Sequence, residues 1–306
     1  MQVTGRTRAA GEHRSLPGVL MELGRFVRIE HSVFALPLVY AGAILAQWGT
    51  PSAPAGVVVW LPPTRVLLLL LLAAVGARTA AMALNRIVDR RLDARNPRTS
   101  SRALVTGRLS LFQATALVVA ALALLVSAAA ALNPLCLLLS PIPVVAFAVY
   151  PLLKRWTAAT HLFLGMTLGM APLGGWLAIR GDLSGLLPPL LLAALMGAWV
   201  AGFDIIYALQ DVDVDRAQGL HSLPAALGPT RALALAKVFH ILAVFGLLAL
   251  WLLLPLSRWA MVLVVCIVAV LVWEHTNSHD VQKAFFVANA LVSGLILLAI
   301  TVGVAA

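Results

Sequence analysis

The chain has 306 residues, of which 61% are hydrophobic and only 11% are charged, and its mean hydropathy is +0.97. Soluble globular domains carry roughly 25% charged residues, so this composition excludes that class and indicates a polytopic membrane protein. The formal net charge of +10 does not indicate nucleic-acid binding, because most basic residues flank apolar runs, where they set membrane topology and contact lipid headgroups. Cys136 and Cys266 both lie inside apolar runs, which leaves neither a disulfide framework nor a zinc site.

The first part of the chain is polar and basic. Residues 1–22 contain Arg but no apolar core, so we expect a disordered cytoplasmic leader and not a signal peptide. From Glu22 to Glu30, apolar side chains alternate with Arg25 and Arg28, which indicates an amphipathic helix at the membrane surface. Residues 23–306 are expected to form a single domain.

Nine apolar segments follow along the chain, and their lengths and hydropathy predict an all-α protein with nine transmembrane helices. The predicted spans are 33–48, 66–84, 111–132, 134–151, 159–178, 186–208, 231–254, 257–273 and 284–304. Turn-forming residues separate them, and Asn133-Pro134 marks the tightest connection, between the third and fourth spans. Gly165, Gly169 and Gly174-Gly175 in the fifth span predict close helix packing.

The basic residues support this count of spans. With nine spans and a cytoplasmic N-terminus, 18 of the 22 Lys and Arg residues fall on the cytoplasmic side. Arg65, Arg180 and Arg258 fall on the opposite side, and Arg78 lies within the second span. This asymmetry is what the positive-inside rule requires, so we expect the N-terminus in the cytoplasm.

A polar motif ends the second span. Asn85, Asp89 and Asp93 are spaced by four residues, which places them within about 80° of each other on a helix. An amide and two carboxylates on one face are oxygen ligands suited to a hard divalent cation such as Mg²⁺. Seven arginines surround this motif and can hold a polyanionic ligand. They are Arg86, Arg90, Arg91, Arg95, Arg98, Arg102 and Arg108.

A second acidic cluster ends the sixth span. At 100° per residue, Asp204, Tyr207, Asp211 and Asp215 share one helical face, within about 80° of one another, while Asp213 points to the other side. Both clusters lie at cytoplasmic ends of predicted spans, so the fold can bring them together. Facing carboxylates would repel each other unless cations bridged them, which favours metal binding over ordinary solvated loop acids.

Other polar residues leave alternatives open. Arg78 lies inside a span, and it either faces a polar cavity or pairs with a structural carboxylate. Lys154, after Tyr150-Pro151, either reaches a phosphate or carboxylate or serves topology alone. His275 and His279 have the spacing of a metal pair, but a solvated loop is the favoured interpretation. His161 and His240 are each interpreted as structural.

Taken together and in order, these motifs resemble those of the UbiA superfamily of intramembrane prenyltransferases. The resemblance rests on Asn85-x3-Asp89-x3-Asp93, on Arg98-Thr99-x-x-Arg102, on Tyr150-Pro-x-x-Lys154-Arg, and on Asp211-x3-Asp215. The sequences Ile29-Glu30-His31 and Asn96-Pro97-Arg98-Thr99 are most similar to those of the 4-hydroxybenzoate polyprenyltransferases and of the menaquinone prenyltransferases of the futalosine route. The similarity extends from about residue 25 to residue 305.

The resemblance implies a nine-helix bundle around a central cavity that opens to lipid. It also implies a Mg²⁺ site in which Asn85, Asp89, Asp93, Asp211 and Asp215 hold the metal against a prenyl diphosphate. The catalytic residues implied are Lys154 and the four Asp residues of this site. Arg86 stands where many relatives carry Asp, which removes one metal ligand. The residues expected to bind the diphosphate are Arg95, Arg98, Arg102 and Lys154. Those expected to contact the aromatic acceptor or to be accessory are Arg78, Tyr150, Asp204 and Tyr207.

The activity implied is Mg²⁺-dependent transfer of a polyprenyl group to an aromatic ring, 4-hydroxybenzoate or a hydroxynaphthoate, in ubiquinone or menaquinone biosynthesis. The enzyme would lie in a bacterial-type plasma membrane with its active site toward the cytoplasm and without an obligatory protein partner. Haem, chlorophyllide and glycerol phosphate ethers are alternative acceptors, since the metal motifs do not distinguish them. An ion-coupled transporter is a less favoured alternative, because transporters place their charges near the membrane midplane.

Overall fold

The computed structural model describes residues 16–27, 36–48, 61–254, 256–277 and 281–305, and throughout these ranges the secondary structure is helical, with no strand. The helices, in chain order, are α1 (Leu16–Val27), α2 (Leu36–Trp48), α3 (Thr64–Val88), α4 (Arg90–Asp93), α5 (Leu111–Leu132), α6 (Pro134–Leu139), α7 (Pro141–Leu153), α8 (Thr160–Arg180), α9 (Leu187–Ala208), the 3₁₀ turn η2 (Leu209–Asp211), α10 (Val212–Ala217), α11 (Leu223–Leu227), α12 (Pro229–Leu253), α13 (Ala260–Thr276) and α14 (Val281–Ala305).

The described helices confirm an integral membrane protein. Seven helical segments in the described ranges are long and apolar enough to cross a bilayer, and α2 and α13 are shorter apolar helices. Each predicted span coincides with one of these segments or shorter helices. That all nine cross the membrane, and that the N-terminus is cytoplasmic, stay predictions.

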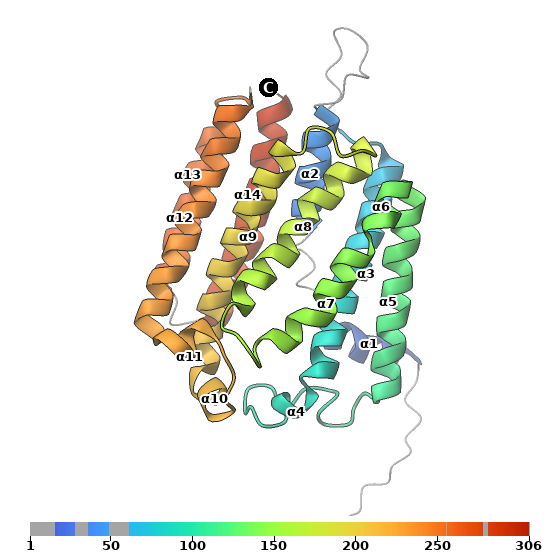
Figure 1. The fold of residues 1–306 in the computed structure, drawn as a ribbon, viewed down its shortest axis with the longest axis vertical. Helices are drawn as coiled ribbons and strands as arrows, with labels where there is room; N and C mark the ends of the chain where they lie inside the picture. The colour runs from blue at the N-terminus through green and yellow to red at the C-terminus, as the bar shows by residue number, and fades with distance from the viewer. Residues whose placement is uncertain (1–15, 28–35, 49–60, 255, 278–280, 306) are drawn as a thin grey trace, which may run out of the picture.

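Long helices stand side by side in Figure 1, and the short helices α4, α10 and α11 gather at one end of the bundle. The closest neighbours are α3 with α5, α8 with α9, α9 with α12, and α2 with α8. The largest apolar core lies among α2, α8, α9, α12, α13 and α14. This packing leaves one end of the bundle to the polar connections, where both acidic motifs lie.

Small residues allow the helices on either side of α8 to approach it. A Cβ added at Gly175 would lie 2.0 Å from the carbonyl oxygen of Val39 on α2, and one added at Gly165 would lie 2.2 Å from the carbonyl oxygen of Gly197 on α9. Such close backbone contact is typical of helix pairs in membranes. The predicted role of these two glycines is therefore confirmed, whereas Gly174, directly beside Gly175, faces open space.

Polar caps define the ends of several helices. Ser110 and Gln113 form a capping box that starts α5. Asn133 ends α5 and caps α6 by accepting the backbone N–H of Cys136, while its amide donates to the carbonyl of Leu177 on α8. The sharp connection predicted at Asn133-Pro134 is therefore confirmed.

The structure changes the prediction for the N-terminal region. Helix α1 begins at Leu16, inside the segment predicted to be a disordered leader, and residues 1–15 lie outside the described part. Phe26 and Val27 are buried against Ala83 of α3, and Glu22 forms a 3.1 Å ion pair with Arg108. The amphipathic helix predicted over Glu22–Glu30 is thus present up to Val27 and packs on the protein, and residues 28–30 lie outside the described part.

Candidate functional site

A cavity of about 200 Å³ lies at the polar end of the bundle. Its walls come from the end of α3, α4 and the following loop, from α7 and α8, and from the segment running from α9 through α10 to α11. Eleven of the predicted site residues line it: Asn85, Asp89, Asp93, Arg98, Arg102, Tyr150, Lys154, Asp204, Tyr207, Asp211 and Asp215. The two acidic motifs, more than one hundred residues apart in sequence, therefore face one cavity.

The first motif is not on an unbroken helix. Helix α3 ends at Val88, and Asp89 adopts φ −87° and ψ 0° before α4 begins. The one-turn spacing nevertheless persists, because the N–H of Asp89 donates to the carbonyl of Asn85 at 2.9 Å and that of Asp93 to the carbonyl of Asp89 at 2.8 Å. The three side chains therefore stay on one face despite the break, and both carboxylates are buried.

The second motif also departs from a regular helix. A 3₁₀ turn at Leu209–Asp211 separates α9 from α10, although the sequence predicts one continuous face. Asp204, Tyr207, Asp211 and Asp215 all line the cavity in spite of this turn, and Asp213 is exposed, as predicted. A 3₁₀ turn has 3.0 residues per turn, whereas an α-helix has 3.6. The turn therefore changes the angle about the helix axis between the Asp211 side chain and the side chains before it.

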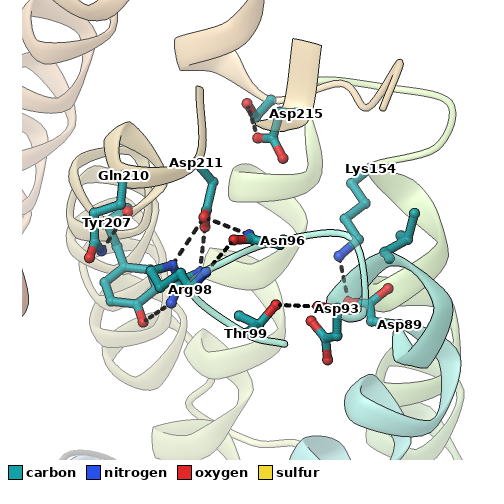
Figure 2. Close-up of polar contacts among 12 residues, drawn as sticks. Asp89, Asp93, Asn96, Arg98, Thr99, Lys154, Tyr207, Gln210, Asp211 and Asp215 are labelled. Atoms are coloured by element: carbon teal, nitrogen blue, oxygen red, sulfur yellow. Dashed lines mark hydrogen bonds and ion pairs between the residues drawn. The ribbon is translucent and has the colours of Figure 1, made fainter. Parts of the chain in front are cut away.

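Three of the motif carboxylates are paired with cations. Figure 2 shows the pairs of Arg98 with Asp211 and of Lys154 with Asp89. Arg98 donates two hydrogen bonds to Asp211, from Nε to Oδ1 at 3.0 Å and from Nη2 to Oδ2 at 2.5 Å. Arg102 Nη1 lies 2.7 Å from both oxygens of Asp93. Lys154 Nζ forms a short ion pair with Asp89. The predicted diphosphate ligands therefore neutralise the predicted metal ligands in this structure.

The loop after α4 joins the two motifs. The amide of Asn96 donates to Asp211 Oδ1 at 2.9 Å, and its own side-chain oxygen accepts the N–H of Arg98 at 2.9 Å. Arg98 also donates to the hydroxyl of Tyr207 at 3.2 Å and stacks over its ring at 5.5 Å. Thr99 is buried and bonds the carbonyl of Asp93 at 3.1 Å. The Asn96-Pro97-Arg98-Thr99 sequence thus holds the first motif against α9.

The pKa of Asp89, which follows the end of α3, is shifted by its surroundings. Burial raises the pKa of its carboxyl group, while the nearby ammonium of Lys154 acts in the opposite direction. Its second oxygen, Oδ1, is buried and has no hydrogen-bond partner. A buried, unpaired carboxylate oxygen in a cavity lined by further carboxylates fits a hard divalent cation. Across the described ranges, no three His, Cys, Asp or Glu side chains converge on one point in the present arrangement.

Two predicted residues lie away from the cavity walls. Arg95 is exposed and does not line the cavity, so its predicted contact with diphosphate is not supported by this geometry. The reason is the turn after α4, which directs Arg98 and Arg102 inward and Arg95 outward. Arg78 is partly buried within α3, two helical turns before Asn85. Arg86 is buried and stacks over the Phe26 ring at 5.4 Å, away from the site.

Several cavity residues have no role in the sequence-based prediction. His161 is buried and bonds Asp204 at 2.7 Å, and Ser222 is buried and bonds Asp215 at 2.7 Å. Asn96 and Thr99 belong to a sequence that indicated the family but not their contacts. The available signal for His161 was a polar residue at the start of an apolar span, a pattern that by itself indicates a structural histidine.

A second cluster of polar residues comprises Glu274 and His275, from a region that the sequence predicts to be a solvated loop, together with His240. Glu274 is completely buried, and His275 Nε2 lies 3.0 Å from His240 Nδ1. These residues belong to α12 and α13 and do not line the cavity, so the interpretation of this region as a solvated loop is wrong up to Thr276. His279 lies outside the described residues. The additional turn of α13 places the two side chains inside the bundle.

Comparisons with known proteins agree with this architecture. The model of the UbiA prenyltransferase family matches residues 35–291. An apo UbiA homolog from Aeropyrum pernix K1 is 37% identical, with a TM-score of 0.79 over 90% of this chain and 98% of that one. A UbiA homolog from Archaeoglobus fulgidus bound to GPP and Mg²⁺ has the same fold, with 22% identity and a TM-score of 0.66 over 92% of this chain and 99% of that one.

Among curated sequences, the 4-hydroxybenzoate octaprenyltransferase of Shewanella amazonensis is 29% identical over 187 residues. That match covers 61% of this chain and 64% of the relative, which is slightly less than two thirds of its length.

Proposed function

The chain belongs to the UbiA prenyltransferase family, and from this premise we propose that it transfers a polyprenyl group from a prenyl diphosphate to an aromatic ring. The acceptor that we propose is 4-hydroxybenzoate or a hydroxynaphthoate, in quinone biosynthesis. One observation carries the proposal: two acidic motifs and three basic side chains, Arg98, Arg102 and Lys154, line the same cavity. The name of the curated Shewanella relative supports the aromatic acceptor.

The residues fit Mg²⁺ as the cofactor. Asn85, Asp89 and Asp93 on one side and Asp211 and Asp215 on the other supply oxygen ligands only, and Asp89 keeps one buried oxygen unpaired. The Archaeoglobus fulgidus homolog of the same fold binds GPP and Mg²⁺, which supports the same use here. When bound, Mg²⁺ would neutralise the diphosphate and make it a better leaving group.

The basic residues around the motifs are suited to the diphosphate itself. Arg98 and Arg102 present planar guanidinium groups, which bind phosphate oxygens in pairs, and Lys154 supplies a point charge. Departure of the diphosphate leaves an allylic carbocation, which must be protected from water. Residues of α7, α8 and α9 line this cavity within the helix bundle, and these walls would limit the access of bulk water to that carbon. An electron-rich phenol then attacks through carbon and loses a proton.

The polyprenyl tail would lie along apolar side chains of the bundle. Burial of each CH₂ group contributes roughly 0.8 kcal/mol, so a long tail adds substantial binding energy without polar contacts. For the acceptor, we propose that Arg78 or Lys154 binds its carboxylate. The Ala variants of both residues are expected to raise the KM for the acceptor, and unchanged KM values in both would contradict this assignment.

The orientation of the protein in the membrane is part of the same proposal. We propose nine transmembrane helices with a cytoplasmic N-terminus, in a bacterial-type plasma membrane, with the cavity open toward the cytoplasm. The concentration of Lys and Arg near the polar end of the bundle supports this orientation. The substrates and membrane lipid are the partners that this activity requires.

The test uses membranes that contain the full chain. They are incubated with radiolabelled geranyl diphosphate, Mg²⁺ and either 4-hydroxybenzoate or a dihydroxynaphthoate, and the lipid extract is separated. We expect a Mg²⁺-dependent prenylated product that is absent from the Asp89→Asn, Asp211→Asn double variant. The ring that is accepted identifies the acceptor class. If folded wild-type protein prenylates no aromatic compound, the proposed acceptor class is wrong.

A further inference from the structure

Asp204 differs from the motif carboxylates in its partner. Asp89, Asp93 and Asp211 each pair with a Lys or Arg side chain. Asp204 instead receives a 2.7 Å contact from Nδ1 of His161, which is only 3% exposed. The side chain of Asp204 remains 16% exposed and lines the cavity. This carboxylate is therefore held by an imidazole while it still faces the space that a substrate would occupy.

The second nitrogen of His161 identifies which tautomer is present. The backbone N–H of Leu223 donates to His161 Nε2 at 3.3 Å, so Nε2 must offer its lone pair. The ring proton then resides on Nδ1, where it is donated to Asp204 Oδ2. His161 is neutral in this arrangement, so it orients the Asp204 carboxylate without adding a positive charge. The carboxylate keeps its other lone pairs for a donor in the cavity.

Four consecutive residues, 220–223, connect this pair to the rest of the site. Within this segment the N–H of Leu220 bonds the carbonyl of Asp215 at 2.8 Å, and the N–H of His221 bonds the carbonyl of Lys154 at 2.7 Å. Ser222 Oγ donates to Asp215 Oδ2 at 2.7 Å, and Leu223 bonds His161. One short segment thereby orders His161 relative to the second motif and Lys154.

Asp204 lies deeper in the bundle than the motif. It precedes Asp211 by seven residues on the same helical segment, a distance of about 10 Å along the axis. Arg78 precedes Asn85 by seven residues on α3, and Tyr150 lines the cavity together with Asp204. Asp204 therefore lines the cavity on the side away from the diphosphate ligands, where we place the acceptor of the proposed reaction.

We propose that Asp204 is the base that takes up the hydroxyl proton of the aromatic acceptor, and that His161 is its positioning residue. This inference rests on the proposed function. A phenol is a weak acid, but its hydroxyl becomes strongly acidic as the ring carbon shares its electrons with the allylic cation. A carboxylate placed at that hydroxyl makes the ring a better nucleophile during the attack.

The proton and electron balance is complete within the reaction. The C1–O bond to diphosphate breaks first, and the ring carbon beside the hydroxyl-bearing carbon then bonds to C1 of the allylic cation. The hydroxyl proton passes to Asp204, and the ring becomes a dienone. The ring carbon then loses its proton to the released diphosphate, and Asp204 returns its proton to the oxygen. The products are the prenylated phenol and protonated diphosphate.

The first test compares Asp204→Asn with Asp213→Asn, an exposed acid nearby. Loss of a general base typically lowers turnover by about 10²–10⁴-fold. We expect D204N to lower kcat within this range, to leave the KM for prenyl diphosphate close to the wild-type value, and to retain binding of Mg²⁺ with inorganic pyrophosphate. D213N is expected to match the wild type. A ring-fluorinated acceptor, whose hydroxyl is more acidic, should reduce the deficit of D204N.

His161 is tested with two variants. Asn places an amide N–H near the position of Nδ1, so H161N should retain more activity than H161F, which offers no donor. Both should show the same dependence on acceptor acidity as D204N, which a structural role would not produce. Should D204N fail to accumulate in membranes, this pair of variants decides the question.

The outcomes separate this inference from the proposed function. If the wild type gives no prenylated aromatic product, the proposed function fails. If the wild type is active and D204N is equally active, or if D204N loses Mg²⁺ and pyrophosphate binding as an Asp211 variant would, only the inference about Asp204 and His161 is overturned.

Discussion

Asp211 owes its position to side chains from a loop more than one hundred residues earlier in the chain. Arg98 binds both of its oxygens and Asn96 binds one of them. Because a bidentate guanidinium contact depends on a planar fork, a Lys at position 98 cannot replace it, although it conserves the charge.

The first prediction concerns this contact. Loss of one charge-assisted hydrogen bond costs about 1.5–3 kcal/mol, so Arg98→Lys is expected to lower kcat/KM by roughly 10- to 100-fold. Arg95→Lys is the matched control, because Arg95 is exposed and does not line the cavity. Steady-state kinetics in detergent or nanodiscs measure both variants. Equal activities would show that Arg98 contributes charge alone.

The second prediction concerns pH. Burial raises the pKa of Asp89, with Lys154 opposing the shift, so Asp89 retains its proton at pH values where a free carboxyl group, with a pKa near 4, has released it. A divalent cation must displace that proton, and the affinity for the cation should therefore fall as the pH is lowered. Binding of Mn²⁺ as a probe, measured in the presence of pyrophosphate, should show a steeper pH dependence in the wild type than in Asp89→Asn. Identical slopes would contradict a metal role for Asp89.

At the scale of the elements, α8 depends on glycine for its contact with α2. The Cβ position of Gly175 lies 2.0 Å from a backbone oxygen, which cannot move aside as a flexible side chain can. The neighbouring Gly174 has nothing within 4 Å of its Cβ position. Helices that meet through backbone atoms tolerate no added methyl group.

The third prediction follows from this pair of residues. Gly175→Ala should separate α2 from α8 and destabilise the protein by about 1–3 kcal/mol, the usual cost of overpacking. Gly174→Ala should leave the stability nearly unchanged. The melting temperatures of the two variants in the same detergent provide the measurement. If the Gly174 variant is destabilised as much as the Gly175 variant, then helix propensity, and not the contact between α8 and α2, determines the loss of stability.

At the scale of the whole molecule, the site is neutralised internally. Lys154, Arg98 and Arg102 each form an ion pair with a carboxylate that is proposed to bind the metal. Binding of an anion by these cations would leave buried or half-buried carboxylates without a partner, and binding of a metal by the carboxylates would leave half-buried cations without one. Either event alone is therefore costly.

The fourth prediction is that metal and diphosphate bind cooperatively. Ligands that bind only the folded state raise its stability according to their occupancy. We expect Mg²⁺ alone and pyrophosphate alone to raise the melting temperature little, and the two together to raise it by more than the sum of their separate effects. Lys154→Ala should weaken this synergy, since the unpaired Asp89 is then free to accept the metal. Additive shifts in the wild type would refute the proposed exchange of partners.

Much of this architecture is predictable from the sequence, because hydropathy alone identifies membrane helices when no water is available to their backbones. The predicted spans coincide with the described helices, and the four-residue spacing in each motif places its carboxylates on the side that faces the cavity. Local periodicity is retained where Asp89 and the 3₁₀ turn at Leu209–Asp211 interrupt the helices, since one-turn hydrogen bonds persist around the first break.

Pairings between distant side chains could not be predicted in the same way. The contacts of Arg98 with Asp211, of Lys154 with Asp89 and of His161 with Asp204 span 113, 65 and 43 residues. Several arginines near the first motif are equivalent by sequence, and only the turn after α4 decides that Arg98 and Arg102 point inward while Arg95 points outward.

The sequence by itself determined the class of the protein, the order of its helices and the residue types of its two motifs, because these depend on hydropathy and on spacing within one helix. The tertiary structure alone decided which cation meets which carboxylate, that Asp204 meets a neutral histidine, and that Glu274 is buried beside two histidines. These outcomes depend on how separate helices pack and on which polar groups lose their access to water, and neither is encoded in a local pattern.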